Sequence, residues 1–206
     1  MTPLDLDTSQ LLAIAAALGW ASGLRLYAVV FLTGLAGTLG WVDLPRGLQV
    51  LQHPAMLGAS GFMLFVEFFA DKIPGLDSLW DVAHTVLRIP AGAALAASVF
   101  GADQATMATV AALLGGTLAA TSHVAKATTR AAVNTSPEPF SNVGMSLLGD
   151  AAVPAMLWLS WASPIAFFSV LALAVAVMAA LIWLLAKFLR ALARRFTGGL
   201  RAGPTA

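Results

Sequence analysis

The chain has 206 residues, of which 59% are hydrophobic and only 10% are charged, with a formal net charge of +1 and no cysteine. Soluble domains carry roughly a quarter of their residues as charges, so this composition indicates a membrane protein. The lack of cysteine excludes disulfides, thiolate metal sites and cysteine nucleophiles, and so small a net charge gives no indication of nucleic-acid binding.

Apolar runs long enough to cross a bilayer recur along the chain. A helix needs about 20 apolar residues to cross a hydrocarbon core of about 30 Å, and residues 165–186 contain no charge at all. The sequence therefore predicts an all-α, polytopic transmembrane bundle. Six spans are expected, at about 9–39, 54–71, 82–101, 105–126, 143–161 and 164–187. Residues 1–196 would form one transmembrane domain, and residues 197–206 a disordered C-terminal tail.

The first segment is longer than one span requires. Residues 9–39 are interrupted in the middle by Gly19-Trp-Ala-Ser-Gly23. Either one strongly tilted helix or a re-entrant hairpin turning at residues 21–23 would account for this length. Arg25 follows the interruption, and an arginine at the start of a half-helix is suited to bind an anion. Structural pairing of Arg25 with an acidic residue such as Glu67 is the alternative.

The densest group of ionisable side chains lies in residues 67–88. Glu67 and Asp71 are four residues apart and share one helix face. After Pro74-Gly75 interrupts the helix, the spacing again predicts one polar face, formed by Asp77, Asp81, His84 and Arg88. Charges are costly in hydrocarbon, so these side chains should face a protein interior or a water-filled cavity. A solvated helix lying on the membrane surface is the alternative.

A second polar face is expected on the fourth span. It consists of His123, Lys126, Arg130 and Asn134, spaced by three, four and four residues. Small residues dominate 105–125 and predict close helix packing at the centre of the bundle. Asn142 and Asp150 follow on the next helix, after a second proline-containing connection at 134–142. This connection resembles the one at 71–81, which suggests an internal repeat around one site.

The two faces differ in sign, since acids prevail in the first and bases in the second. Facing one another, they would offset much of their desolvation cost. Histidines beside carboxylates are typical of proton relays, which gives His84 and His123 a candidate role. Asp77, Asp81 and His84 could also hold a divalent metal, although no motif supports it. A purely structural ion-pair network is the alternative, and no cofactor is expected.

The basic residues predict the orientation. With six spans and both termini cytoplasmic, the inner side would carry Lys72, Arg88, Lys126, Arg130, Lys187, Arg190, Arg194, Arg195 and Arg201. Only Arg46 would lie in an outer loop, which agrees with the positive-inside rule.

Four groups of residues resemble the pattern of a known family. They are Ala21-Ser-Gly-Leu-Arg25-Leu-Tyr27; Glu67…Ala70-Asp71-Lys72-Ile-Pro74…Asp77…Asp81; Arg88-Ile-Pro-Ala-Gly92; and His123…Lys126…Arg130. Over roughly 10–185 the chain resembles an uncharacterised family of bacterial integral membrane proteins, defined only as a domain of unknown function. The resemblance implies the bacterial inner (plasma) membrane and no particular activity. Members often have Glu-Asp where this chain has Gly149-Asp150, which leaves the role of Asp150 open.

The function expected from these patterns is a small transporter or channel for an ion or a small polar or anionic solute, proton-coupled through the carboxylates and histidines. A translocase for a phosphate-bearing lipid is the first alternative, and a membrane enzyme acting on a lipid head group is the second. The partners would be the bilayer, a solute, ion or lipid head group, and a second copy in a homodimer. The candidate binding residues are Arg25, Glu67, Asp71, Lys72, Asp77, Asp81, His84, Arg88, His123, Lys126, Arg130, Asn142 and Asp150.

Overall fold

The computed structural model describes residues 6–73, 75–135 and 140–199, and in these ranges the chain is all-helical. No strand occurs in them, so the predicted all-α class is confirmed. The elements are α1 (Thr8–Thr38), η1 (Arg46–Gln52), α2 (Pro54–Ala70), α3 (Leu76–Ser98), η2 (Ala102–Gln104), α4 (Ala105–Val133), α5 (Phe140–Ala162) and α6 (Pro164–Gly199). The six α-helices coincide with the six predicted segments.

Fewer than six of the helices satisfy the requirements for a membrane span by length and composition. Four of them do so alone: α1, α4, α5 and α6. The short helix η1 and α2 form a pair bent by 70°, which would make a fifth. Helix α3 is long enough, with 23 residues, but it carries Asp77, Asp81 and Arg88 inside the bundle. Its composition is therefore too polar for a membrane span of this kind.

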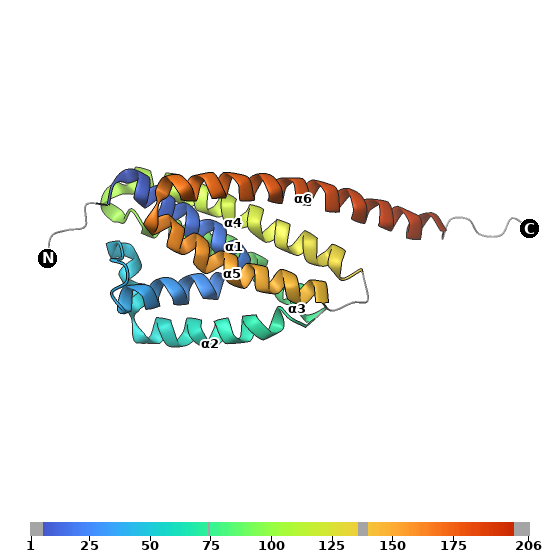
Figure 1. Cartoon of the computed structure of the whole chain (residues 1–206), viewed down its shortest axis with the longest axis horizontal. Coiled ribbons are helices and arrows are strands. Elements are labelled where there is room, and N and C mark those ends of the chain that lie inside the picture. The colour runs from blue at the N-terminus through green and yellow to red at the C-terminus, as the bar shows by residue number, and fades with distance from the viewer. Residues whose placement is uncertain (1–5, 74, 136–139, 200–206) are drawn as a thin grey trace, which may run out of the picture.

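Helix α1 is a re-entrant hairpin. Its backbone leaves the helical region at Arg25 (φ −149°, ψ 83°). The half before Arg25 runs toward the middle of the bundle, and the half after it returns to the same end (Figure 1). Gln10, near the start of α1, donates a hydrogen bond to the carbonyl of Trp161. The hairpin alternative is therefore correct, with the turn at Arg25 instead of residues 21–23.

The first half of α1 forms the centre of the fold. Residues 13–26 are all buried. Gly19 packs so closely on Gly115 of α4 that a Cβ would collide with the Gly115 backbone, and Gly23 packs in the same way on Ala119. Small residues permit this approach of backbones. Helix α4 packs closely on α1, α3 and α6, as its small residues predicted, although Val110, Leu113 and Val124 on its outer side are exposed.

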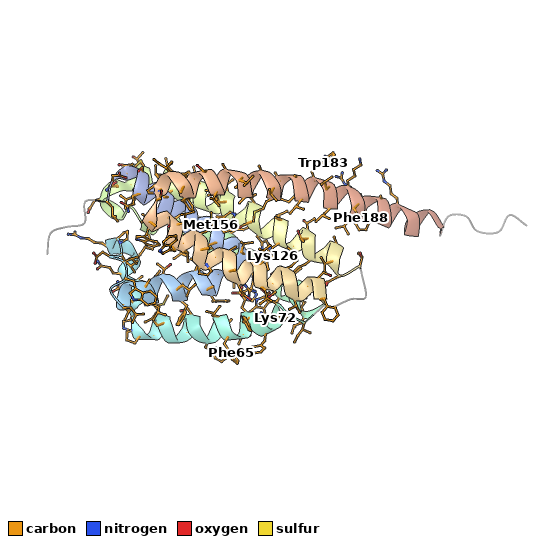
Figure 2. All side chains as sticks on the ribbon, in the orientation of Figure 1. Phe65, Lys72, Lys126, Met156, Trp183 and Phe188 are labelled. Carbon is orange, nitrogen blue, oxygen red and sulfur yellow. The ribbon has the colours of Figure 1, made fainter. Side chains whose placement is uncertain are left out.

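Large apolar side chains cover the outside of the bundle. Figure 2 shows Phe65 on the outer side of α2, and Trp183 and Phe188 on α6; all three are exposed. A soluble domain rarely exposes large contiguous apolar patches, whereas hydrocarbon solvates them well. The exposed faces therefore agree with the membrane class.

The two ends of the described chain lie at opposite ends of the bundle (Figure 1). Because the α1 hairpin returns to the side from which it starts, only α2 to α6 alternate in direction. This arrangement departs from the expectation of both termini on one side. Helix α6 continues to Gly199, beyond residue 197 where the tail was expected to start. Residues 200–206 lie outside the described residues, and the disordered tail stays a prediction.

Candidate functional site

The polar faces predicted on α3 and α4 lie against each other in the interior. Asp81 on α3 and Arg130 on α4 are joined by an ion pair of 3.1 Å. At one end of the contact Asn134 donates hydrogen bonds to Asp77, and at the other Thr85 Oγ1 lies 2.8 Å from His123 Nε2. These faces are packed inside the bundle, so the surface-helix alternative for 77–88 was wrong.

Asp71, at the end of α2, is a carboxylate that meets three cations. Its Oδ1 accepts a hydrogen bond of 2.8 Å from Arg130, and its Oδ2 accepts one of 3.1 Å from Lys126. Arg25 Nη1 lies 2.8 Å from the same Oδ2, an ion pair without the alignment of a hydrogen bond. Asp71 is completely buried. Three cations from α1 and α4 therefore converge on one carboxylate, and Arg25 is paired with Asp71 instead of Glu67.

Asp81 also meets three cations. Arg88 lies 2.5 Å from it on its own helix, and Lys126 and Arg130 each approach to 3.1 Å from α4. Lys126 and Arg130 thus bridge Asp71 and Asp81. The Lys126 ammonium also donates a 3.0 Å hydrogen bond to the carbonyl of Leu24, at the break in α1.

Glu67 is paired differently. Its Oε1 accepts a 2.7 Å hydrogen bond from Arg88, and both side chains have no exposed surface. Glu67 Oε2 is buried and has no hydrogen-bond partner in the part of the chain that the structure describes. Glu67 therefore meets one cation through one oxygen.

Asp77 has a local role at the start of α3. Its Oδ1 accepts hydrogen bonds from the backbone N–H groups of Gly75 and Ser78. Gly75 has φ +87°, a conformation that glycine adopts without strain. Arg130 is 3.9 Å away, at the edge of ion-pair distance. Asp77 thus stabilises the turn that begins α3, and it lies beside the ion pairs of Asp71 and Asp81 without sharing their close contacts.

Lys72 and Asp150 extend the network to α5. Asp150 forms an ion pair of 2.8 Å with Arg25 and accepts a hydrogen bond of 3.1 Å from Lys72, and it is 22% exposed. Arg25 also donates to the carbonyl and hydroxyl of Ser146. The Lys72 ammonium lies 3.1 Å from the centre of the Phe68 ring, a cation–π contact. The predicted Asp150 is therefore part of the network.

The two histidines do not form one relay. His84 lies 3.2 Å from the Tyr27 hydroxyl and stacks on Trp80. His123 lies 3.5 Å from Arg88 as well as 2.8 Å from Thr85. Only His123 touches the ion pairs.

Two further predictions receive less support. Asp77, Asp81 and His84 face different partners, and the described residues contain no group of three such side chains arranged to hold a metal. The predicted metal site is therefore not formed. Asn142 is buried, but its amide has no hydrogen-bond partner in the described parts of the chain, so it does not join the network. The proline break behind it, at 136–139, lies outside the described residues.

The ion pairs balance in charge. They connect five cations with five carboxylates: Arg25, Lys72, Arg88, Lys126 and Arg130 with Glu67, Asp71, Asp77, Asp81 and Asp150. Burying a charge costs several kcal/mol unless a partner of opposite sign accompanies it. A neutral network removes most of that cost, and any change of one unit of charge inside it restores part of the cost.

A cavity of about 410 Å³ adjoins the network among α1, α4, α5 and α6. Its walls are mostly apolar and include Trp20, Met145, Met156, Val170 and Met178. Four residues of the network also line it, and we call them the charged floor: Arg25, Asp71, Lys126 and Arg130. Helix α5 packs mainly on α1 and makes few contacts with α4 and α6, which leaves room for this cavity.

A second cavity, of about 380 Å³, lies on the other side of the α1 turn, among α1, η1, α2 and α3. Its lining is apolar apart from Tyr27, Ser60 and Ser98. Arg25 lines the first cavity and Leu26 and Tyr27 line the second. The turn of α1 therefore separates the two.

Most of the chain matches one known protein family. The profile described as "Domain of unknown function (DUF4126)" matches residues 12–187. The chain belongs to the DUF4126 family. Neither the curated proteins nor the solved structures contain a match to this chain. The expected membership of a family of unknown function is thus confirmed. Among the predicted binding residues of this DUF4126 chain, His123 touches the ion-pair network through Arg88, His84 and Asn142 lie outside it, and the other ten belong to it.

Several residues of the site were not among the predicted binding residues. Tyr27, Thr85 and Ser146 each hydrogen-bond to a predicted residue. Ser146 precedes Asp150 by one helical turn, so helical spacing from Asp150 could have identified it. The apolar lining of the first cavity on α5 follows the same spacing, at Met145, Gly149, Ala152 and Met156.

Proposed function

We propose that this protein binds an anionic amphiphile, a lipid with a phosphate-type head group, and moves it across the bacterial inner membrane. The observation that carries the proposal is the first cavity, which combines apolar walls with the charged floor. Ligand pockets of roughly 300–1,000 Å³ with a few convergent polar groups are typical of small-molecule binding sites. An acyl chain suits the walls, and an acidic head group suits the arginine and lysine side chains.

The charges of the floor support an anionic head group over a cationic one. Three cations line the cavity with one carboxylate, Asp71, whose oxygens already face those cations. Arg25 and Arg130 present guanidinium groups, which bind phosphate oxygens through paired hydrogen bonds. A cation entering the cavity would meet an excess of like charge.

The expected orientation follows from the basic residues. Lys72, Lys187 and Arg190 belong to the end of the bundle where α6 finishes, whereas Arg46 belongs to the opposite end (Figure 1). The positive-inside rule then assigns the C-terminal end to the cytoplasm. The start of α1, with Asp7, would lie outside, because both halves of the hairpin end on the same side. The charged floor is nearer the cytoplasmic side in this arrangement.

Transport of a small polar or anionic solute is the second candidate. The second cavity supports it, because a carrier needs access to its central site from two directions and the α1 turn separates two cavities. Transporters of this kind use broken helices near the middle of the bilayer. The homodimer expected from the sequence stays a prediction in either case.

The experiment follows a fluorescent phosphatidylglycerol across phosphatidylcholine vesicles that contain the full chain. Ala174 lines the cavity, so the substitution Ala174→Phe fills it without altering a charge. Ala172→Phe is the matched control, because Ala172 is exposed on the same helix. We expect Ala174→Phe to slow lipid movement at least tenfold and Ala172→Phe to leave it unchanged.

Equal rates in the two variants would contradict the assignment of the cavity. If phosphatidylglycerol does not move while a soluble anion such as phosphate accumulates inside the vesicles, the second candidate is favoured. A chemically altered lipid head group after incubation would point to an enzyme.

A further inference from the structure

Glu67 is the carboxylate of the ion-pair network with the fewest partners. Asp71 and Asp81 each meet three cations. Asp150 meets two, and Asp77 accepts two backbone N–H groups and the Asn134 amide. Glu67 meets Arg88 alone, and its second oxygen is buried without a partner among the described residues. An unpaired buried oxygen of a carboxylate is a position that a proton can occupy with the least loss of existing contacts.

We propose that Glu67 is the proton-binding site of this protein and that the proton enters together with a singly charged anion in the first cavity. This inference rests on the proposed function for the identity of the anion, but not for the proton site itself. Protonation turns the Glu67 carboxylate into a neutral acid, with the proton taken from solvent, and no other bond is formed or broken.

Charge balance links the proton to the anion. With five cations and five carboxylates the network is neutral. A proton on Glu67 leaves one uncompensated positive charge inside the bundle, which costs several kcal/mol. One negative charge beside the charged floor cancels it. The stoichiometry is therefore one proton per monoanion, and a phosphodiester head group fits it better than a dianionic monoester.

A continuous series of ion pairs joins the proton site to the cavity. Arg88 contacts both Glu67 and Asp81. Asp81 contacts Lys126 and Arg130, which are part of the charged floor. When Glu67 becomes neutral, Arg88 is left with Asp81 as its carboxylate partner. Asp81 then binds Lys126 and Arg130 less strongly, and these two cations become more available to a ligand in the cavity.

The surroundings of Glu67 offer an approach from the second cavity. The groups that face it are Arg88 on α3 and Tyr27 on α1, which interacts with Glu67 electrostatically. Behind Arg88 lie Asp81 and, on α4, His123 and Lys126. Tyr27 lines the second cavity and lies 3.2 Å from His84. Tyr27 therefore lines the second cavity and is close enough to Glu67 to interact with it electrostatically.

The first test is infrared spectroscopy of the full chain in vesicles while the pH is lowered. The chain has two glutamates, Glu67 and Glu138. Labelling glutamate with ¹³C at the side-chain carboxyl therefore assigns a protonated glutamic acid without any substitution at Glu67. We expect the C=O band of a protonated acid to appear on acidification and to shift with the label. It should persist in Glu138→Gln and disappear in Glu67→Gln.

An unshifted band, or one that disappears in Glu138→Gln, would overturn the assignment to Glu67. The absence of any protonated-acid band at all would overturn it too. The labelled wild type keeps this test decisive even if Glu67→Gln does not fold, because it needs only the Glu138→Gln variant.

The second test measures coupling through binding of phosphatidylglycerol as a function of pH. If one proton accompanies the lipid, the affinity should rise about tenfold for each unit of decreasing pH above the transition. In Glu67→Gln the affinity should not depend on pH. A pH dependence that survives in Glu67→Gln would overturn the coupling. If phosphatidylglycerol fails to bind at any pH while the labelled band appears, the proton site stands and the proposed lipid function is wrong.

Discussion

The inner and outer parts of the ion-pair network differ in burial and in the number of partners. In the inner part, formed by Glu67, Asp71, Arg88 and Asp81, every side chain is at most 2% exposed. In the outer part, Lys72 and Asp150 are 19% and 22% exposed, and water can solvate each of them. The same types of side chain therefore serve different purposes. The inner part joins the end of α2 to α3 and, through Arg25 and Arg130, also to α1 and α4. The outer pair attaches α5 at the edge of the first cavity.

The largest expected effect comes from removing the anion shared by three cations. Asp71→Asn leaves Arg25, Lys126 and Arg130 with one carboxylate fewer inside the bundle. We expect the free energy of unfolding to fall by about 3–5 kcal/mol, as for a broken buried ion pair. Unfolding by SDS in mixed micelles measures this change.

Asp43→Asn is the matched control, because Asp43 is exposed in the loop between α1 and η1. We expect it to leave the unfolding midpoint unchanged. A loss of stability in Asp71→Asn no larger than in Asp43→Asn would mean that the inner network does not hold the helices together.

A smaller effect is expected from the close helix packing that brings the inner pairs together. Gly19→Val would push α1 away from the Gly115 backbone, and overpacking of this kind costs about 1–3 kcal/mol. Gly58→Val is the control, because a Cβ at Gly58, also in a helix, would meet no other atom within 4 Å. The same SDS assay should separate the two variants. If both lose the same stability, helix propensity and not packing is responsible.

The smallest effect is expected at the outer pair. Asp150→Asn removes two ion pairs, but Asp150 is partly solvated and Arg25 keeps its contact with Asp71. Partly exposed pairs contribute about 1 kcal/mol or less. The unfolding midpoint should therefore change much less than in Asp71→Asn. A loss as large as that of Asp71→Asn would remove the distinction between inner and outer parts.

Helical spacing was sufficient to predict most of the site. The intervals from Asp77 to Arg88 and from His123 to Asn134 each indicated one face of a helix, and the structure packs these faces together. The cost of charge in hydrocarbon then predicted that opposite signs would meet. Glu67 and Asp71 were correctly assigned to the same site for the same reason.

What spacing could not predict is which cation meets which carboxylate and how the chain turns. Arg25 pairs with Asp71 and Asp150 instead of Glu67, because the break in α1 falls at Arg25 itself. A one-residue difference in the position of a break rotates a side chain by about 100° around a helix. The hairpin also leaves the two ends of the described chain at opposite ends of the bundle, whereas six crossings would place them at the same end. The first cavity was missed because it depends on the distance between helices far apart in the sequence.

The break in the middle of α1 has a consequence for the order in which contacts form during synthesis. The carbonyl of Leu24 is bonded by Lys126, 102 residues later, and Arg25 is bonded by Ser146, 121 residues later. A chain that emerges at about 5–20 residues per second leaves the hairpin without these partners for several seconds. Asp71 follows α2 and is the first ion-pair partner of Arg25 to be made, whereas Asp150 on α5 comes much later. The first helix to be made is therefore among the last to gain all of its final contacts.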